Sequence, residues 1–342
     1  MTDEIAYLAE RFRKFADPQV RSSSPLYARL TLGIAELPDV LALCVERLEG
    51  QPAPLLLFGA VHSLLLAGAQ HPLRQYYPDL VATPHDDDPV PVFADFCLQY
   101  ADELRAIIRS HRVQTNEVGR CSLLLPAFSL VALQTQKPLA IIEIGASAGL
   151  HLCWDSYGYE YSNGQALSPS PEALLTLQCE VRGAALPLMD NFPQVAWRVG
   201  LELHPLDVVN RPEDRAWLRA LLWPENPIRV ARYEAAVKTL IASPQRLIEG
   251  DAIADLPTLI AEAPEGCALC VVQSFVLYQF TPKQREAFQQ VLVDASQQRD
   301  IYSINLDSKE TDLEMRLTHY GQTINDVLLA RIEAHGKWIE WM

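Results

Sequence analysis

The chain carries little positive charge for its length. Its 342 residues include 28 Lys and Arg against 43 Asp and Glu, so the formal net charge is −15. Contacts with phosphate groups need a basic surface, and this balance argues against non-specific nucleic-acid binding. We therefore expect that the chain does not bind nucleic acid.

The most apolar run in the sequence is also short. It extends from Leu55 to Ala67, which is too few residues to span a bilayer, and it contains His62. Asp3, Glu4 and Glu10 stand where a secretion signal would carry basic residues. We expect a cytoplasmic protein that does not bind membranes, either a monomer or a homodimer.

The seven cysteines form neither a disulfide framework nor a metal-binding pattern. Their odd number, without a framework spacing, is typical of reduced thiols in a cytoplasm. Cys267 and Cys270 match the C-x-x-C spacing, but they fall in an apolar strand where the two positions point to opposite faces. The sequence contains no H-E-x-x-H, nucleophile-elbow or Walker motif. We expect no metal site.

The first 135 residues are predicted to be entirely helical. Apolar residues recur at helical spacing, as at Ile5, Leu8 and Phe12, and Ser24-Pro25 is typical of a helix start. The predicted helices cover residues 4–15, 26–35, 39–48, 55–69, 91–110 and 119–134. We expect residues 1–135 to form an N-terminal helical domain that covers the rest of the chain as a lid.

From Pro138 onward, strands alternate with helices. The predicted strands cover residues 139–144, 195–203, 246–249, 268–274 and 301–306, and the helices lie at 149–156, 212–223, 228–241, 254–262 and 281–298. This alternation predicts an α/β domain with a doubly wound, mostly parallel sheet over residues 136–342. Residues 313–319 and 325–332 predict a terminal antiparallel hairpin, and 157–164 with 175–183 predict a second hairpin, inserted near 157–183.

The stretch Leu139 to Gly149 reads as a buried strand that turns through glycines into a helix. Such a turn presents bare backbone N–H groups at a helix N-terminus, and small residues let a ligand approach the backbone closely. Nucleotide-type cofactors are held in this way at the carboxyl edge of parallel sheets. The candidate cofactor-binding residues are Gly145, Ala146, Ser147 and Gly149. Glu143 binds either the cofactor's amino group or a nearby loop amide.

A polar cluster at Gln114 to Arg120 lies about 20 residues before this loop. Asn116, Glu117 and Arg120 suit a zwitterion such as an amino-acid group, because Glu can hold an ammonium and Arg a carboxylate. The alternative is a capping box, with Thr115 or Asn116 as the helix N-cap, together with a buried ion pair.

The order of five parallel strands and an antiparallel pair resembles the class I S-adenosylmethionine-dependent methyltransferase fold, which implies a seven-stranded sheet. Glu143-x-Gly145-x-x-x-Gly149 resembles the first motif of those enzymes, with Ser147 in place of the middle glycine. The resemblance implies further cofactor-binding residues: Glu202 for the ribose hydroxyls, and Asp251 with Ala252 for the adenine. It also implies catalytic-site residues near the transferred methyl group: Gln273, Ser274 and Tyr278.

Several of these residues have an alternative interpretation. Glu202 is either the ribose ligand or a surface carboxylate, and Asp251 either faces the adenine or caps the helix from Ala254. Tyr278 either lines the substrate pocket or covers the sheet edge. The remaining catalytic candidate, His319, and also His335, could serve as a general base or be structural.

Over the whole chain, five segments together resemble an uncharacterised bacterial family, domain of unknown function 2332. They are Ser24–Tyr27, Gln114–Arg120, Glu143–Leu150, Gly250–Ala252 and His335–Trp338. The resemblance implies a fold but no reaction.

The main hypothesis is an S-adenosylmethionine-dependent methyltransferase-like protein that acts on an unidentified small molecule. Methyl transfer is an in-line displacement that mainly requires two positioned reactants, so few catalytic residues are obligatory. The second hypothesis is a non-catalytic relative that binds a nucleoside or a protein partner. The third is an NAD-dependent oxidoreductase in which Glu202 binds the NAD ribose.

Overall fold

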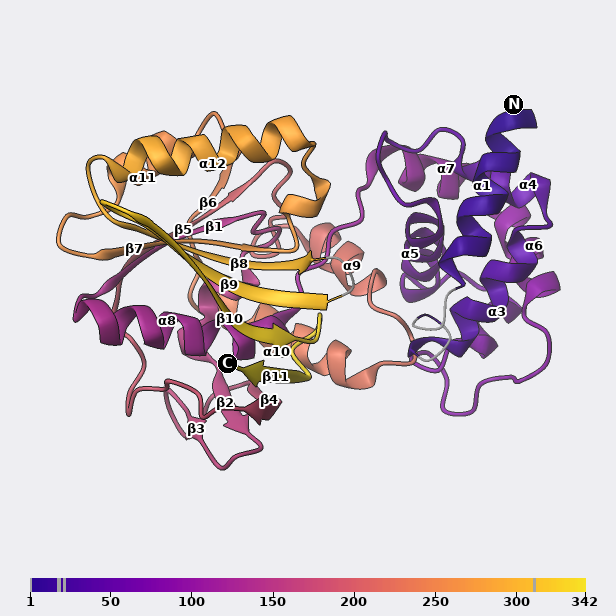
Figure 1. The fold of residues 1–342 in the computed structure, drawn as a ribbon. Helices are drawn as coiled ribbons and strands as arrows, with labels where there is room; N and C mark the ends of the chain where they lie inside the picture. The colour runs from indigo at the N-terminus through magenta and orange to yellow at the C-terminus, as the bar shows by residue number, and fades with distance from the viewer. Residues whose placement is uncertain (1, 17–19, 21–22, 310–311) are drawn as a thin grey trace. The chain divides into compact units, whose positions relative to one another are not determined.

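The computed structural model describes residues 2–16, 20, 23–309 and 312–342 and folds into two compact units (Figure 1). The first unit contains Met1–Thr115 and Arg211–Ala231, and the second contains Asn116–Asn210 and Arg232–Met342. These boundaries differ from the predicted division at residue 135.

The first unit is helical, as its sequence predicts. Its helices are α1 (Thr2–Phe15), α3 (Pro25–Ile34), α4 (Pro38–Leu41), α5 (Ala53–Leu66), α6 (Val90–Gln99), α7 (Ala101–Ser110) and α9 (Pro212–Ala220), with 3₁₀ helices η1 (Ala42–Cys44) and η2 (Pro72–Tyr76). Ser24 caps α3, since its side chain accepts a hydrogen bond from the Tyr27 N–H at 3.2 Å. The helix predicted at 91–110 is divided in two at Tyr100.

Aromatic packing forms the core of this unit. The Phe58 ring stacks on Tyr27 with centroids 4.3 Å apart and contacts Phe12 and Phe93 edge-on. Gly59 lets α9 approach α5 closely, because a Cβ there would lie 2.8 Å from the Leu221 side chain. This contact places α9 in the helical unit, although the sequence predicts it as a helix of the α/β domain.

The second unit contains one eleven-stranded sheet. Its strands are β1 (Leu139–Ile144), β2 (Gly158–Tyr161), β3 (Ala166–Leu167), β4 (Thr176–Gly183), β5 (Val195–Glu202), β6 (Leu247–Glu249), β7 (Ala268–Ser274), β8 (Ile301–Lys309), β9 (Asp312–Tyr320), β10 (Ile324–Ile332) and β11 (Trp338–Trp341). Their order is β3-β2-β4-β11-β10-β9-β8-β7-β1-β5-β6. The section from β8 to β6 is parallel, as predicted, and β9 with β10 forms the predicted antiparallel hairpin.

The predicted seven-stranded sheet is wrong in its strand count. β11 pairs with β10 on one side and with β4 on the other, and so joins the inserted strands to the main sheet. The predicted hairpin between 157–164 and 175–183 is also wrong, because β2 and β4 run parallel and the antiparallel partner of β2 is the short β3. The chain between them returns to the start of β2, where the Gly158 N–H donates to the Leu175 carbonyl at 2.8 Å.

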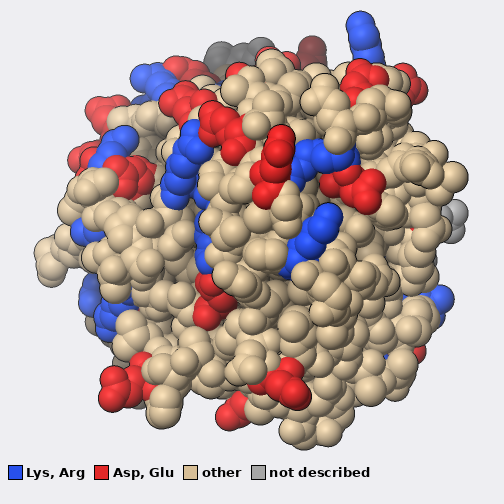
Figure 2. Space-filling view, turned by 90° about the vertical axis from the view of Figure 1, so that its left-hand side faces the viewer, with Lys and Arg blue, Asp and Glu red and all other residues tan. Residues whose placement is uncertain are grey.

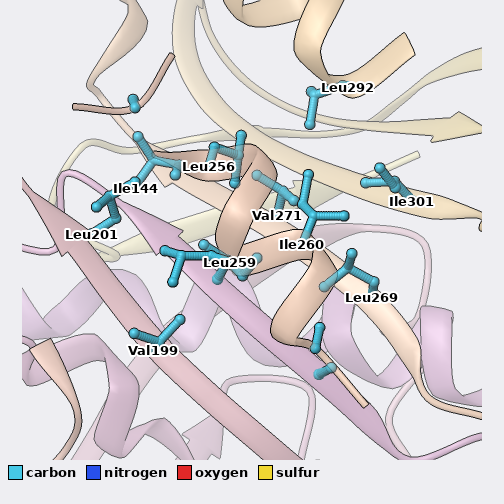
Figure 3. Close-up of a cluster of buried hydrophobic side chains, with 14 of the residues drawn as sticks. Ile144, Val199, Leu201, Leu256, Leu259, Ile260, Leu269, Val271, Leu292 and Ile301 are labelled. Atoms are coloured by element: carbon cyan, nitrogen blue, oxygen red, sulfur yellow. The ribbon is translucent and has the colours of Figure 1, made fainter. Parts of the chain in front are cut away.

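Helices cover both faces of the sheet in the second unit (Figure 1). α11 (Leu256–Glu262) and α12 (Pro282–Ser296) pack on one face, and α8 (Cys121–Thr135) contacts β7 and β4 from the other. The remaining helices are η3 (Val118–Arg120), η4 (Leu150–Ser156), η5 (Leu277–Gln279) and α10 (Pro227–Ala242), which contains the last boundary between the units. Figure 3 shows the apolar cluster beneath α11 and α12, including Ile144, Val271 and Ile301.

One helical stretch in the described part of the chain, Val118–Thr135, is long and apolar enough to cross a membrane by length and composition alone. It includes α8, and 78% of it is buried inside the protein. This burial is typical of a core helix, which explains its apolar composition without a membrane.

Candidate functional site

The parallel strands reverse their order at β1. β1 pairs with β5 on one side and with β7 on the other, and β6 and β8 extend these two halves outward. In open α/β sheets, ligands bind beyond the carboxyl ends of the strands at such a switch point. The loop from Gly145 to Gly149 follows β1 directly at this position.

The loop has the left-handed backbone that its glycines permit. Gly145, Ser147 and Gly149 have φ angles of 69°, 54° and 78°. Ser147 is the one non-glycine residue among them, and its backbone is therefore strained. The helix that follows begins at Leu150 as the 3₁₀ helix η4.

Most N–H groups of the loop already have partners within the protein. Those of Gly145 and Ala146 donate to the Leu201 carbonyl, that of Gly149 donates to the Ala146 carbonyl, and that of Ser147 is held by a side chain. The expectation of bare amides is therefore wrong at these positions. Strand β5, which lies next to β1, supplies the Leu201 carbonyl as the acceptor. Donors that have no acceptor nearby in the sequence are thus satisfied by a neighbouring strand.

The space beside Gly145 is occupied by a protein side chain. A Cβ at this position would overlap Val276, which follows β7. Gly145 is therefore required by its packing against Val276 and by its left-handed backbone.

Glu202, at the end of β5, reaches across to the loop. One carboxylate oxygen accepts from the Ser147 N–H at 2.9 Å, and the other accepts from the His204 N–H at 3.1 Å. The contact joins residues 55 positions apart and confirms that the loop and this carboxylate lie together. Glu202 is half-buried and braces the loop, so it is more than a surface carboxylate.

The polar cluster at 116–120 also reaches the loop. The Asn116 side-chain oxygen accepts from the Leu150 N–H at 3.0 Å and so caps η4, whereas Glu117 accepts from the Gly119 N–H at 3.2 Å. Arg120 is buried and donates to the Ala334 carbonyl at 2.8 Å. Glu117, and not Thr115 or Asn116, is therefore the N-cap residue of the 3₁₀ helix that follows, so the capping alternative is wrong in its residues. The bond to Leu150 places the cluster beside the candidate site.

The Arg120 guanidinium also contacts the end of β7. It donates to Ser274 Oγ at 3.3 Å and lies over the Phe275 ring, 4.5 Å from the centroid. Phe275 has a φ of 57°, which is rare for an aromatic residue. The Arg120 contact thus fixes the strand end where the chain turns away from the sheet.

His151 is a site residue that the sequence reasoning missed. Its Nδ1 lies 2.7 Å from Glu143 Oε1 and its Nε2 lies 2.8 Å from the Glu117 carbonyl oxygen, and the Glu143 and His151 side chains are buried. Because both ring nitrogens face acceptors, both bonds form together only if the ring is an imidazolium or Glu143 carries a proton. Glu143 Oε2 is buried and has no hydrogen-bond partner among the described residues. Glu143 therefore holds His151 and not a loop amide.

The residues predicted at the end of β7 have very different environments. Gln273 is buried, with 1% exposure, and neither atom of its side-chain amide has a hydrogen-bond partner within the described parts of the chain. Ser274 binds Arg120, and Tyr278, in η5, is 61% exposed. Tyr278 therefore has most of its side chain open to solvent, unlike the buried Gln273.

His319 lies at the wrong edge of the sheet for catalysis with these residues. It pairs with Tyr302 near the start of β8 and stacks on that ring at 4.7 Å, whereas Ser274 pairs with Leu306 further along the same strand. Parallel strands rise about 3.3 Å per residue, which places His319 towards the amino edge. The expectation that it belongs to the carboxyl-edge site is wrong.

His335 lies in the turn between β10 and β11 and has a structural partner. Its Nδ1 is 2.9 Å from Glu333 Oε1, and Glu333 Oε2 accepts from the N–H groups of His335 and Lys337. Burial alone would raise the pKa of Glu333, but these hydrogen bonds outweigh it and lower the pKa to about 2.

Asp251 caps the turn that leads into α11. One oxygen of its side chain accepts from the Ile253 N–H at 2.8 Å and from the Ala254 N–H at 2.9 Å. The helix itself begins at Leu256, with Asp255 as its N-cap residue. Asp251 therefore closes a turn and does not cap a helix from Ala254, whereas Ala252 is buried against the apolar cluster.

The described residues contain no group of three or more His, Cys, Asp or Glu side chains that could hold a metal ion. Cys270 is buried and Cys267 half-buried, and burial raises the pKa of Cys270. Figure 2 shows acidic and basic side chains interspersed on the face drawn there, without a patch of one sign.

The chain belongs to the family described as "Uncharacterized protein conserved in bacteria (DUF2332)", which matches residues 9–341. This finding confirms the family that the five sequence segments resemble. No curated protein and no solved structure matches the chain.

Proposed function

We propose that this DUF2332 protein binds S-adenosylmethionine at the carboxyl ends of β1 and β5 and transfers its methyl group to a small molecule in the cytoplasm. The observation that carries the proposal is the 2.9 Å hydrogen bond between Glu202 and the Ser147 N–H. It joins the glycine loop to the carboxylate expected to bind ribose, at the switch point of a parallel sheet.

The residues at this edge retain capacity for such a cofactor. A carboxylate has about four acceptor sites, and each Glu202 oxygen uses one for a backbone N–H. Two sites remain for the vicinal ribose hydroxyls. Asp251 uses one of its two oxygens for the turn before α11, which leaves the other for the adenine amino group.

When bound, the sulfonium would supply the methyl group and the leaving group, so the protein has mainly to position the reactants and exclude water. Arg120 and Asn116 fix the two segments that flank the site, at Ser274 and at Leu150. The buried Glu143–His151 pair links β1 to η4, the two elements that flank the loop. This arrangement supports positioning more than acid–base chemistry.

Calorimetric titration with S-adenosylhomocysteine and S-adenosylmethionine tests the proposal. We expect saturable heat with one site per chain for both ligands. The absence of heat with either ligand, from a protein whose melting curve shows that it is folded, would exclude the methyltransferase.

A non-catalytic relative that binds a nucleoside or a protein partner is the second candidate. Two observations favour it: Val276 occupies the space beside Gly145, and the loop amides are bonded within the protein. Adenosine distinguishes the two candidates, since a nucleoside-binding relative would give heat with adenosine and no methyl transfer to any acceptor.

A further inference from the structure

Two neighbouring side-chain amides, at the carboxyl edge of the sheet, have buried polar atoms without a hydrogen-bond partner among the described residues. Gln273, at the end of β7, is 1% exposed, and both its Nε2 and its Oε1 are buried without a hydrogen bond among the described residues. Asn305 on β8 is its partner in the strand register, and its Oδ1 is likewise buried and unbonded within the same residues.

Both amides point to the same face of the sheet. Side chains alternate along a strand, so Gln273 shares the face of Leu269 and Val271, which belong to the apolar cluster beneath α12. Asn305 shares the face of Ile301 in that cluster. Neighbouring strands lie about 4.8 Å apart, which puts the two amides within reach of one small molecule.

An unpartnered amide in such a place reduces stability. Buried polar groups in proteins are almost always hydrogen-bonded, and a donor or acceptor left unbonded loses its interaction with water. The register neighbour of Gln273 on β1 is Ile144, and an apolar side chain would suit the surrounding cluster better. A residue that contradicts its packing environment in this way is typical of a functional site.

We propose that Gln273 and Asn305 bind an uncharged group with a hydrogen-bond donor beside an acceptor, such as a carboxamide or the ring amide of a nucleobase, and that this group belongs to the methyl acceptor. This inference rests on the proposed function. A side-chain amide that offers both an N–H donor and a carbonyl acceptor binds such a group through two parallel hydrogen bonds.

The position of the pair decides between the acceptor and the cofactor. The residues proposed for the ribose and the adenine lie on β5 and after β6, on one side of β1, whereas Gln273 and Asn305 lie on β7 and β8, on the other. A carboxylate suits the pair less well than an amide, because it offers only acceptors, whereas Gln273 leaves both a donor and an acceptor unbonded among the described residues.

The test uses matched amides and acids: benzamide with benzoate, and nicotinamide with nicotinate. Binding to the full chain, with S-adenosylhomocysteine present, is measured by saturation-transfer NMR. We expect each amide to bind at least about tenfold more tightly than its acid, a difference of about 1.4 kcal/mol. Gln273→Met should abolish the preference, whereas the exposed Gln298→Met should retain it. Equal binding of amides and acids, or an unchanged preference in Gln273→Met, would overturn the proposal.

The melting temperature of Gln273→Met distinguishes a ligand-binding amide from a structural one, because the two roles predict changes of opposite sign. Gln273→Met replaces an unbonded amide by an apolar side chain of similar length, so we expect its melting temperature to rise by a few degrees. A fall would show that the amide has a structural partner, and would overturn the proposal. Calorimetry with S-adenosylhomocysteine alone tests the cofactor site without the acceptor. If the cofactor analogue binds but the amides show no preference, only the Gln273 site fails; if the analogue does not bind, the proposed function fails.

Discussion

Gly119 and Gly336 pack backbone against backbone. A Cβ on Gly336 would overlap the Gly119 carbonyl, and a Cβ on Gly119 would overlap the His335 carbonyl. Ser122 Oγ completes the contact by donating to the carbonyls of both glycines, at 2.8 and 3.3 Å. Two of the family's sequence segments, more than 200 residues apart, therefore meet because neither has a side chain at the crossing.

We expect Gly336→Ala to destabilise the protein strongly. The residue has a φ of 76°, which costs an L-residue about 1–2 kcal/mol, and the overlap with Gly119 adds about 1–3 kcal/mol. Gly266→Ala is the matched control, since its φ is 81° but a Cβ there meets nothing within 4 Å. Urea unfolding measures both variants, and equal losses would show that the contact with Gly119 has no effect on stability.

The Glu143–His151 pair predicts strong coupling. Removing one member of a buried pair leaves the other without its partner, which costs about 3–5 kcal/mol. We expect Glu143→Gln and His151→Asn each to lower the free energy of unfolding by about 3 kcal/mol, and the double variant to lose much less than the sum. Additive losses in this double-mutant cycle would contradict a direct interaction.

Glu333 makes stability depend on acid pH. Its pKa is lowered from 4.5 to about 2 in the folded protein, so the ionised form stabilises the fold. This contribution is complete above about pH 4.5 and is lost as the pH falls towards 2. We expect Glu333→Gln to lose less stability than the unaltered chain across this interval, measured by urea unfolding at successive pH values. Parallel pH profiles would show that the hydrogen bonds to His335 and Lys337 do not favour the charged form.

Glu202→Gln tests the ribose site. The neutral amide keeps the shape of the side chain but loses acceptor capacity at the Ser147 loop. We expect S-adenosylhomocysteine to bind at least about tenfold more weakly, a loss of about 1.4 kcal/mol. The control is Glu265→Gln, which removes an exposed carboxylate in the turn before β7 and should bind like the unaltered chain. Unchanged affinity in Glu202→Gln would leave Glu202 only its role in bracing the loop.

Local patterns in the sequence predict most of the elements. β1 and β7 begin and end at the predicted residues, because each is a short apolar run bounded by turn residues. The helix predicted at 39–48 is less regular, since α4 ends at Leu41 and continues as a 3₁₀ turn. Pairing was harder to predict than the elements themselves: nothing local indicates that β11 joins β10 to β4.

The candidate site was predictable as a set of segments but not as a set of bonds. The loop and the carboxylate meet because the carboxyl ends of parallel strands share one edge. The polar cluster, which follows no strand, reaches them through the hydrogen bond from the Leu150 N–H to Asn116. Their hydrogen bonds are directed mostly at one another, and His151 was missed because a single histidine in a helical pattern has no distinguishing signal. His319 was assigned to the wrong edge, because period-two alternation indicates a strand but not its register.

The sequence by itself therefore determined the two kinds of structure, the glycine turn after β1 and the family, since these depend on residue type and spacing along the chain. Tertiary structure alone decided which donors are already bonded, that Val276 fills the space beside Gly145, and that the Gln273 amide is left without a partner. The reason is physical: hydrogen bonds and close packing depend on distances between segments far apart in the chain, and local periodicity contains no information about those distances.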